Sequence, residues 1–296
     1  MKNVSVIGAG TMGNGIAHAF AQYNFAVTLI DVNEARLNAA FDTIKTNVKR
    51  QVSKAIISVE HKKILLSNIS LQTNMQLGVQ HADIVIEAAT ENLDLKLKIF
   101  KQLDEFAPAN CILATNTSSI SITKIAAATN RPAQVIGMHF MNPVPIMKLV
   151  EIIGGYETSK IVIQKIIDLS IALHKMPCVV NDYPGFVANR ILMPMINEAI
   201  YTLYEGVADV AAIDTVMKLG MAHPMGPLRL ADFIGLDICL SIMRVLHEGF
   251  GNPKYAPCPL LVNMVAAGKL GNKTGEGFYT KNATTNNYDV SKRFNK

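Results

Sequence analysis

A histidine and a glutamate occupy two neighbouring apolar segments of the sequence. His139 lies near the end of the run VIGMHF, and Glu151 lies inside the next run, IMKLVEII. Both segments are predicted to be strands, and the two-residue period of a strand places Glu151 on the same face as Leu149 and Ile153. A charged or polar group in such an apolar setting is costly unless it has a partner. We therefore predict that His139 and Glu151 contact each other.

The predicted pair has the properties of an oriented general base. The carboxylate of Glu151 would fix the tautomer of the His139 ring and stabilise its protonated form. Catalysis by proton transfer needs a group of this kind within reach of a substrate hydroxyl. The residues leave one alternative open, which is a hydrogen-bonded core histidine beside an unrelated glutamate at a sheet edge.

The first thirty residues contain a glycine-rich turn between a strand and a helix. The segment VSVIGAGTMGNGIAHAF begins with a β-branched run, passes through three glycines and then takes on helical spacing. In a dinucleotide-binding fold these glycines allow the turn, the approach of a pyrophosphate and close packing of helix on strand. The alternative is that they are ordinary turn residues. We expect cofactor contacts along this turn, at Gly8, Gly10, Thr11, Met12 and Gly13.

An aspartate follows the second predicted strand, residues 26–30. Asp31 comes eighteen residues after Gly13, where a dinucleotide fold needs an acceptor for the ribose hydroxyl. Its charge would repel the 2′-phosphate of NADP, so the sequence predicts NAD as the cofactor. Arg36, one turn further on, leaves some use of NADP open. The alternative role for Asp31 is as the cap of the next helix.

Residues 34–67 are predicted to form a helical hairpin inserted after the second strand. The apolar positions recur with helical spacing, and basic side chains lie between them, including Lys45, Lys49, Lys54 and Lys63. A single basic residue on such a helix is usually part of its solvated face. Together, the basic residues could contact a substrate that carries phosphate.

Polar side chains follow two further predicted strands. The strand at residues 84–87 is followed by Glu91 and Lys96, at the carboxyl end where cofactor sites lie in open α/β sheets. The strand in CILATNTSSI is followed by the polar residues 116–119. One of their hydroxyls is expected to cap the next helix, residues 122–128, while another faces the cofactor site.

The alternation of strands and helices stops at about residue 183, and the rest of the chain is predicted to be helical. The first helix there is apolar over much of its circumference, which favours a subunit interface, although a core within one chain is the alternative. The expected helices are residues 186–204, 210–219, 228–246 and 259–267, followed by a solvated tail at 280–296. The fold class is therefore α/β, with a Rossmann-type doubly wound sheet at 1–183 carrying a helical-hairpin insert, and an all-α domain at 184–296.

Composition argues against several other classes of protein. Lys and Arg exceed Asp and Glu by 28 to 23, spread along the chain, which is too mild an excess for a nucleic-acid-binding face. The four cysteines have neither CxxC spacing nor the density of a disulfide framework, and the start of the chain has no charged and apolar leader. No apolar run reaches the roughly 20 residues of a membrane span. We expect a cytoplasmic protein that binds no metal, nucleic acid or membrane.

Taken together, these motifs resemble the L-3-hydroxyacyl-CoA dehydrogenase family, most closely its bacterial short-chain members. The resemblance covers nearly the whole chain and departs from the family pattern at Met141, where an aromatic residue is commoner, and at Asn47, where a serine can contact coenzyme A. Long motifs in the correct order are more specific than a glycine fingerprint. The matching segments are VIGAGTMGNGIA, ATENLDLK, TNTSSI, HFMNPVPIMKLVEI, DYPGFVANRI, MKLGMAHPMGPLRLADFIGLD and NKTGEGFY.

The resemblance implies reversible hydride transfer between NAD(H) and C3 of a short-chain 3-hydroxyacyl-CoA, by a homodimer formed through the helical C-terminal domain. It assigns His139 as the catalytic histidine and Glu151 as its glutamate. It implies that Ser118 and Asn189 position the substrate and that Lys54 contacts coenzyme A. NAD contacts are implied at Asp31, Glu91, Lys96, Ser118, Asn142 and Lys273.

Three alternative functions fit the residues less well. Another NAD-dependent hydroxyacid or sugar-acid dehydrogenase could share the two-domain plan. A chain that binds NAD only as a sensor or as a structural dimer would not need the predicted His139–Glu151 pair. Nucleic-acid binding would rest on the mild basic excess alone.

Overall fold

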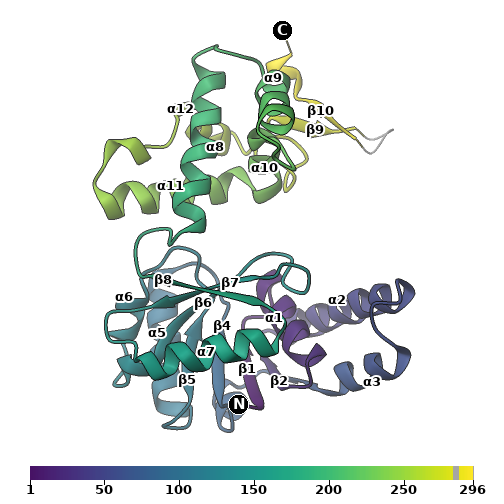
Figure 1. Ribbon diagram of the computed structural model, residues 1–296, viewed down its shortest axis with the longest axis vertical. Coiled ribbons are helices and arrows are strands. Elements are labelled where there is room, and N and C mark those ends of the chain that lie inside the picture. The colour runs from purple at the N-terminus through teal and green to yellow at the C-terminus, as the bar shows by residue number, and fades with distance from the viewer. Residues whose placement is uncertain (283–286, 296) are drawn as a thin grey trace. The chain divides into compact units, whose positions relative to one another are not determined.

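The computed structural model describes residues 1–282 and 287–295. The chain divides into two compact units, Met1–Tyr183 and Pro184–Lys296. The first unit contains a large sheet with helices on both faces, and the second is mainly helical (Figure 1). The predicted fold class is confirmed.

The first unit is built on an eight-stranded sheet with the order β3-β2-β1-β4-β5-β6-β7-β8. The strands from β3 to β6 are parallel, β7 is antiparallel to β6, and β8 is parallel to β7. The order reverses between β1 and β4, which is the switch point where doubly wound sheets bind dinucleotides. The strands are β1 (Asn3–Ile7), β2 (Ala26–Ile30), β3 (Ile69–Gln72), β4 (Ile84–Glu87), β5 (Ile112–Thr115), β6 (Val135–Phe140), β7 (Leu149–Gly154) and β8 (Met176–Asn181).

The two strands that sequence patterns did not predict, β3 and β8, lie at the two edges of this sheet. In β3 only Ile69 is fully buried, and most of β8 is exposed. An edge strand has one neighbour and one open side, so it does not need the continuous apolar run of a central parallel strand. The central strand β4, with all four residues buried, has that run and was predicted with the correct bounds.

Helices cover both faces of the sheet, as the doubly wound fold requires. One face packs its alternate apolar side chains against α1, α2, α3 and α7, and α4, α5 and α6 lie on the opposite face. Glu87, Thr115, His139 and Glu151 alternate with the first set, so they point to the α4–α6 face. The helices are α1 (Thr11–Gln22), α2 (Glu34–Ser53), α3 (Val59–Ser67), α4 (Met75–Val79), α5 (Leu93–Phe106), α6 (Ile122–Ala126) and α7 (Lys160–Ala172).

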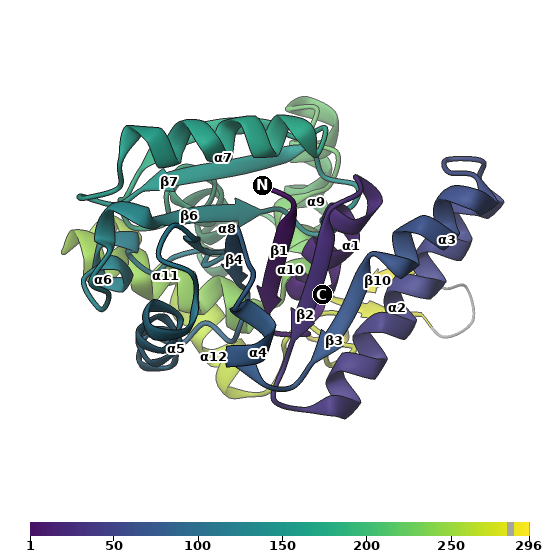
Figure 2. The same cartoon turned by 90° about the horizontal axis from the view of Figure 1, so that it is seen from below.

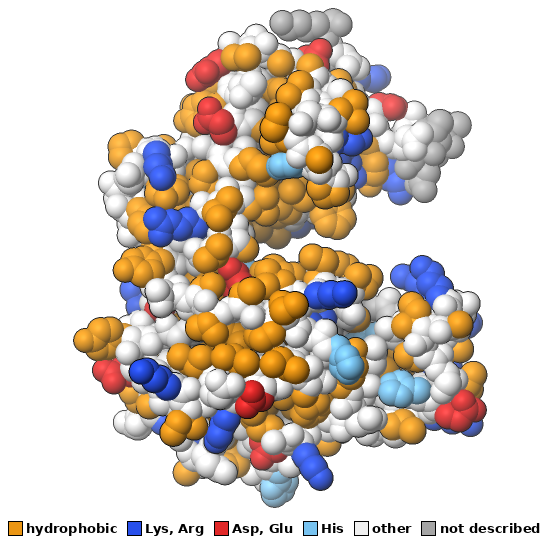
Figure 3. Space-filling view, in the orientation of Figure 1, with side chains coloured by type: hydrophobic (Ala, Val, Ile, Leu, Met, Phe, Trp, Pro, Cys, Tyr) orange, Lys and Arg blue, Asp and Glu red, His pale blue; other side chains and the backbone are white. Residues whose placement is uncertain are grey.

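Helices α2 and α3 form the predicted hairpin, which extends from the β2–β3 edge of the sheet (Figure 2). Asn33 and Ser58 begin the two helices by accepting a hydrogen bond from a backbone N–H of the first turn. Only one stripe of α2 is buried, so its other side is left to polar and basic residues. Basic side chains show at the α2 end of the hairpin, and elsewhere on this face they are mixed with acidic ones (Figure 3).

The second unit is a group of helices around its own apolar core. The prediction of one continuous helix over 228–246 was wrong, because Gly235 separates two helices. Its φ of +105° is a conformation that residues with a Cβ rarely adopt, so the helix ends there. The helices are α8 (Ala188–Tyr204), α9 (Val210–Thr215) with a π-helical turn (Val216–Gly220), α10 (Pro227–Ile234), α11 (Leu236–Phe250) and α12 (Pro259–Ala266).

Most of residues 280–282 and 287–295 are exposed, as the predicted solvated tail requires, but the segment has secondary structure and one buried residue. β9 (Tyr279–Lys281) and β10 (Tyr288–Val290) form an antiparallel ribbon. After it, Ser291 is buried and donates its backbone N–H to Phe278 O at 2.9 Å. The segment is polar in composition but contributes single side chains to the core. Within residues 1–282 and 287–295, none of the helices is both long enough and apolar enough to cross a membrane.

Candidate active site

The glycine turn after β1 has the shape that the sequence predicted. Gly8 has φ +96°, and a Cβ there would lie 2.7 Å from Ala88 O. A Cβ on Gly13 would lie 1.7 Å from Gly8 O, so neither position accepts a side chain without a backbone shift. Around a Cβ on Gly10, by contrast, no heavy atom lies within 4 Å. Gly10 begins α1 and gives the helix N-terminus an open surface, which fits the approach of a pyrophosphate.

Asp31 joins the end of β2 to this turn. Its carboxylate accepts hydrogen bonds from Ala9 N at 2.9 Å and from Asn33 N at 3.0 Å. The cap of α2 is Asn33 and not Asp31, because Asn33 Oδ1 accepts from Arg36 N. The alternative reading of Asp31 as a helix cap is therefore wrong. Its position beside the glycine turn suits an acceptor for a ribose hydroxyl.

His139 and Glu151 are direct cross-strand neighbours on β6 and β7. His139 Nδ1 lies 2.8 Å from Glu151 Oε2, so the predicted contact is present. The two residues are only 8% and 2% exposed, which makes a hydrogen-bonded partner necessary for each. An ionised carboxylate can only accept, so the imidazole donates through Nδ1–H.

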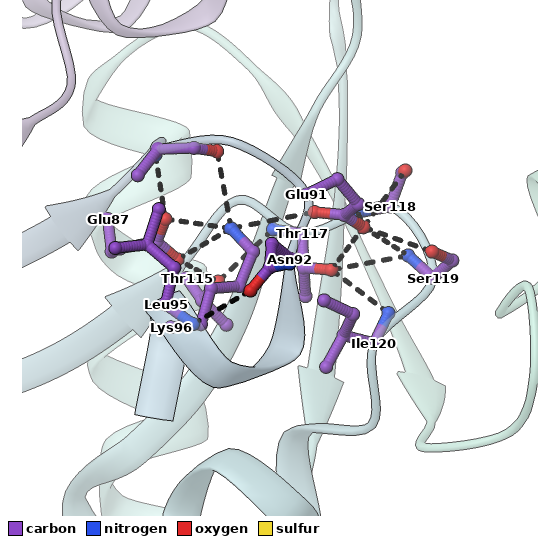
Figure 4. Close-up of polar contacts among 11 residues, drawn as sticks. Glu87, Glu91, Asn92, Leu95, Lys96, Thr115, Thr117, Ser118, Ser119 and Ile120 are labelled. Carbon is purple, nitrogen blue, oxygen red and sulfur yellow. Dashed lines mark hydrogen bonds and ion pairs between the residues drawn. The ribbon is translucent and has the colours of Figure 1, made fainter. Parts of the chain in front are cut away.

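A second buried charge pair lies at the carboxyl ends of β4 and β5 (Figure 4). Lys96, on α5, places Nζ 2.7 Å and 2.9 Å from the two oxygens of Glu87, the last residue of β4. Glu91 Oε2 lies 3.5 Å from the same ammonium. Sequence reasoning selected Lys96 and Glu91 but missed Glu87. The signal was available, because Glu87 ends an apolar run in IVIEA much as Glu151 interrupts one in LVEII.

Glu91 organises the loop after β5 that contains Ser118. Its Oε1 accepts from Thr117 Oγ1 at 2.6 Å, from Ser118 N at 3.0 Å and from Ser119 Oγ at 3.0 Å (Figure 4). Burial alone would raise the pKa of Glu91. The Lys96 ammonium and these hydrogen bonds outweigh burial and hold that pKa below its ordinary value.

Residues 116–119 do not cap the following helix, so that part of the prediction was wrong. The cap of α6 is Ser121, whose Oγ accepts from Lys124 N. Asn116 Oδ1 accepts from Phe140 N at 2.9 Å, which fastens the loop to the residue after His139. The polar cluster is therefore committed to tertiary contacts at the ends of β5 and β6.

The loop after β6, which contains Asn142, is fastened by a lysine that sequence reasoning also missed. Lys175 is buried and donates from Nζ to Val144 O at 2.5 Å and to Met147 O at 2.6 Å. Burial lowers the pKa of this amine. Asn142 itself is exposed. Nothing in the sequence pattern distinguished Lys175 from the solvated lysines around it.

Three further residues were predicted to contact substrate or NAD. Lys54 is the exposed C-cap of α2. In the second unit, Asn189 is a buried residue in the first turn of α8. Lys273 is partly exposed and donates to both oxygens of Asp237 at 2.9 Å. Their contacts with substrate and NAD stay predictions.

Comparisons with known proteins identify the family. Residues 3–183 match the NAD binding domain of 3-hydroxyacyl-CoA dehydrogenase, and residues 185–281 match its C-terminal domain. The chain is 54% identical over 279 residues to the "probable 3-hydroxybutyryl-CoA dehydrogenase" of Bacillus subtilis, covering 94% of this chain and 97% of that one. It is 42% identical over 285 residues to human mitochondrial hydroxyacyl-coenzyme A dehydrogenase, covering 94% and 91%.

A solved structure agrees with these matches. The crystal structure of (S)-3-hydroxybutyryl-CoA dehydrogenase from Ralstonia eutropha superposes with a TM-score of 0.91 at 49% identity, covering 94% of this chain and 98% of that one. The match of residues 3–183 to an NAD binding domain confirms the predicted cofactor. By sequence over both units and by structure, the chain belongs to the 3-hydroxyacyl-CoA dehydrogenase family.

Proposed function

We propose that this chain reversibly transfers a hydride between NAD(H) and C3 of a short-chain 3-hydroxyacyl-CoA, interconverting 3-hydroxybutyryl-CoA and acetoacetyl-CoA. The observation that carries the proposal is the buried His139–Glu151 pair near the carboxyl end of β6, in a domain of the NAD-binding type. Relatives named for this substrate, at 54% and 49% identity, support the acyl-chain class.

His139 carries the proton in this proposal. In oxidation, Nε2 takes the proton of the C3 hydroxyl while the C3–H bond breaks and the carbonyl forms. In reduction, the protonated ring returns that proton to the forming alkoxide. General acid–base help of this kind is worth about 100- to 10,000-fold in rate. When bound, NAD supplies the acceptor for the hydride that leaves C3.

Glu151 and the polar residues around the pair hold the reacting groups in place. The 2.8 Å contact fixes the tautomer of His139, and the carboxylate stabilises the ring while it is cationic. Ser118 and Asn189 are assigned to the substrate oxygens. An error of about 1 Å in such positioning costs around 100-fold.

The cradle for NAD is formed by the glycine turn and Asp31. Gly8 and Gly13 bring the backbone close together, and Gly10 leaves the N-terminus of α1 open for the pyrophosphate. Asp31 would accept from the ribose hydroxyl. Lys54, on the basic hairpin, would contact coenzyme A. Further NAD contacts are assigned to Glu91, Lys96, Ser118, Asn142 and Lys273.

The proposed assembly is a homodimer formed through the second unit. Large apolar side chains are exposed on its helices, such as Ile191 on α8 at 68% and Leu219 in the π-helical turn at 81%. Contiguous exposed apolar surface is typical of interfaces. Light scattering on the purified protein tests this, and a monomeric mass would contradict it.

The test of the proposed function is turnover of acetoacetyl-CoA, followed by the loss of NADH absorbance. Native protein and His139→Gln are compared, with His81→Gln as a control, because His81 is an exposed histidine that comes before β4. We expect His139→Gln to lose about 100- to 10,000-fold in kcat. Thermal unfolding shows that each variant is folded. Near-native turnover of folded His139→Gln would overturn the proton path, and a preference for free hydroxyacids would overturn the substrate class.

A further inference from the structure

Glu87 is a buried carboxylate, and both of its oxygens accept hydrogen bonds. Oε1 accepts from Lys96 Nζ at 2.7 Å and from Ala89 N at 2.7 Å. Oε2 accepts from Lys96 Nζ at 2.9 Å and from Thr115 Oγ1 at 2.7 Å. The residue is 0% exposed. Glu87 thus joins three separate pieces of chain, which are the exit of β4, helix α5 and the exit of β5.

These contacts continue into a closed ring of polar groups (Figure 4). Thr115 Oγ1 accepts from Thr117 N at 3.2 Å. Thr117 Oγ1 donates to Glu91 at 2.6 Å, and the other oxygen of Glu91 lies 3.5 Å from Lys96. Lys96 closes the ring on Glu87. Ser118 is held by the same loop, since its backbone N–H donates to Glu91.

The ring lies beside the proposed proton-transfer pair. Thr115 pairs with Gly137 on β6, two residues before His139 on the same face of the sheet. The loop after β5 is fastened to β6, because Phe140 N, one residue after His139, donates to Asn116 Oδ1 at 2.9 Å. Displacing this loop would therefore disturb both that attachment and Ser118. Glu87 and Thr115 are themselves buried. They contact Lys96 and Thr117, and each of those residues in turn contacts Glu91.

We propose that Glu87 is a positioning residue for the dinucleotide, acting through Lys96 and Thr115 to fix Glu91 and the Ser118 loop. This inference rests on the proposed function, in which Glu91, Lys96 and Ser118 contact NAD. The carboxylates of Glu87 and Glu91 share the Lys96 ammonium, and the two shortest contacts of that ammonium are with Glu87. The ammonium is therefore held in place by Glu87, and it orients Glu91 from there.

Replacement of Glu87 by glutamine tests this geometry. Both oxygens of Glu87 face the Lys96 ammonium, so either orientation of the amide places an NH₂ group against it. We expect the Kd and KM for NADH to rise about tenfold, the equivalent of one lost hydrogen bond. The pH profile of kcat should stay native, because the contact between His139 and Glu151 is untouched.

A matched pair at Thr115 keeps the test valid if Glu87→Gln fails to fold. Thr115→Val removes the hydroxyl that joins Glu87 to the loop, and Thr115→Ser keeps it. We expect Thr115→Val to raise the Kd for NADH about tenfold and Thr115→Ser to stay near native. Asp104→Asn is the structural control. It breaks the 2.7 Å ion pair with Arg131 in the same unit and should lower the thermal midpoint without changing the Kd.

Binding of NADH is measured by its fluorescence, independently of turnover. If Glu87→Gln and Thr115→Val behave like Asp104→Asn, losing stability with a native Kd, Glu87 is only structural and the inference is overturned. Native protein that binds NADH without reducing acetoacetyl-CoA would refute the proposed function, while the shifts in Kd would still decide the role of Glu87. Rescue by Thr115→Ser but not by Thr115→Val supports positioning.

Discussion

The His139–Glu151 pair and the Glu87–Lys96 pair are both buried and hydrogen-bonded on one face of the same sheet, yet they suit different tasks. The imidazole of His139 has a second ring nitrogen beyond the one that contacts Glu151. The Nζ of Lys96 contacts Glu87, Ala89 O and Glu91. In the proposed function the first pair moves a proton, while the second holds the geometry of the cofactor site.

The difference also appears in how each pair is built. His139 and Glu151 sit on adjacent antiparallel strands, directly opposite each other, so the backbone register alone brings them together. Glu87 and Lys96 come from a strand and the helix after it, and they need Thr115 and Glu91 to complete the set. The second group is therefore a network, in which the loss of one member leaves charges without compensation.

The largest effect on stability is expected for Lys96→Met. This change leaves the buried carboxylate of Glu87 and the neighbouring Glu91 without their cation, which costs about 3–5 kcal/mol in the free energy of unfolding. The double variant with Glu87→Leu should recover part of the loss. Urea unfolding of the two single variants and the double variant measures this. Strict additivity would show that the two residues are not coupled.

Glu151→Gln tests the His139–Glu151 pair, and its main effect is expected on turnover. The amide keeps the shape of the side chain but loses the charge and the fixed tautomer of His139, so we expect kcat to fall about 100-fold. That is about 2.7 kcal/mol at the transition state. Steady-state turnover with saturating NADH gives the value. Unlike Glu87→Gln, this variant should bind NADH with a native Kd. A raised Kd would show that the His139–Glu151 pair also affects NADH binding, contrary to the proposed difference between the two pairs.

A smaller effect is expected in the acid dependence of stability, which tests the group of Glu87, Lys96 and Glu91 without involving His139 and Glu151. The pKa of Glu91 is lower in the folded chain than its ordinary value of 4.5. Its contribution to stability is therefore complete above pH 4.5 and is lost as the pH falls through the folded pKa, because the unfolded chain takes up the proton first. In thermal melts between neutral pH and pH 3, Glu91→Gln should flatten this decline. A decline as steep as the native one would show that Glu91 does not contribute.

The smallest expected effect is that of Ser119→Ala. This change removes one of the donors to Glu91, a 3.0 Å hydrogen bond, and leaves the others. We expect a loss of about 1 kcal/mol in the free energy of unfolding, with kcat within about twofold. Thermal melts and turnover on the same preparation measure both. A loss in kcat comparable to that of Glu151→Gln would indicate that a change at Ser119 is transmitted through the loop after β5 to His139 and Glu151.

Sequence patterns were most informative in the central part of the sheet, where strands have neighbours on both sides and helices on both faces. The glycine turn, the strand at residues 84–87 and the contact of His139 with Glu151 all follow from local rules, namely period, turn chemistry and the cost of an unpaired charge. The same rules were silent at the edge strands β3 and β8 and on the break at Gly235. There the conformation is set by neighbours far along the chain, and the local composition is ambiguous.

The sequence by itself determined the doubly wound domain, the helical domain after it, the cofactor and the contact between His139 and Glu151. It could do so because each has a signature within a short stretch of chain. Only the tertiary structure decided that Asn33 and not Asp31 caps α2, that residues 117–119 bind Glu91, and that Glu87 holds Lys96. In each case several side chains nearby in the sequence could form the hydrogen bond equally well. The bond forms with the one that the packing of strands and helices brings within about 3 Å.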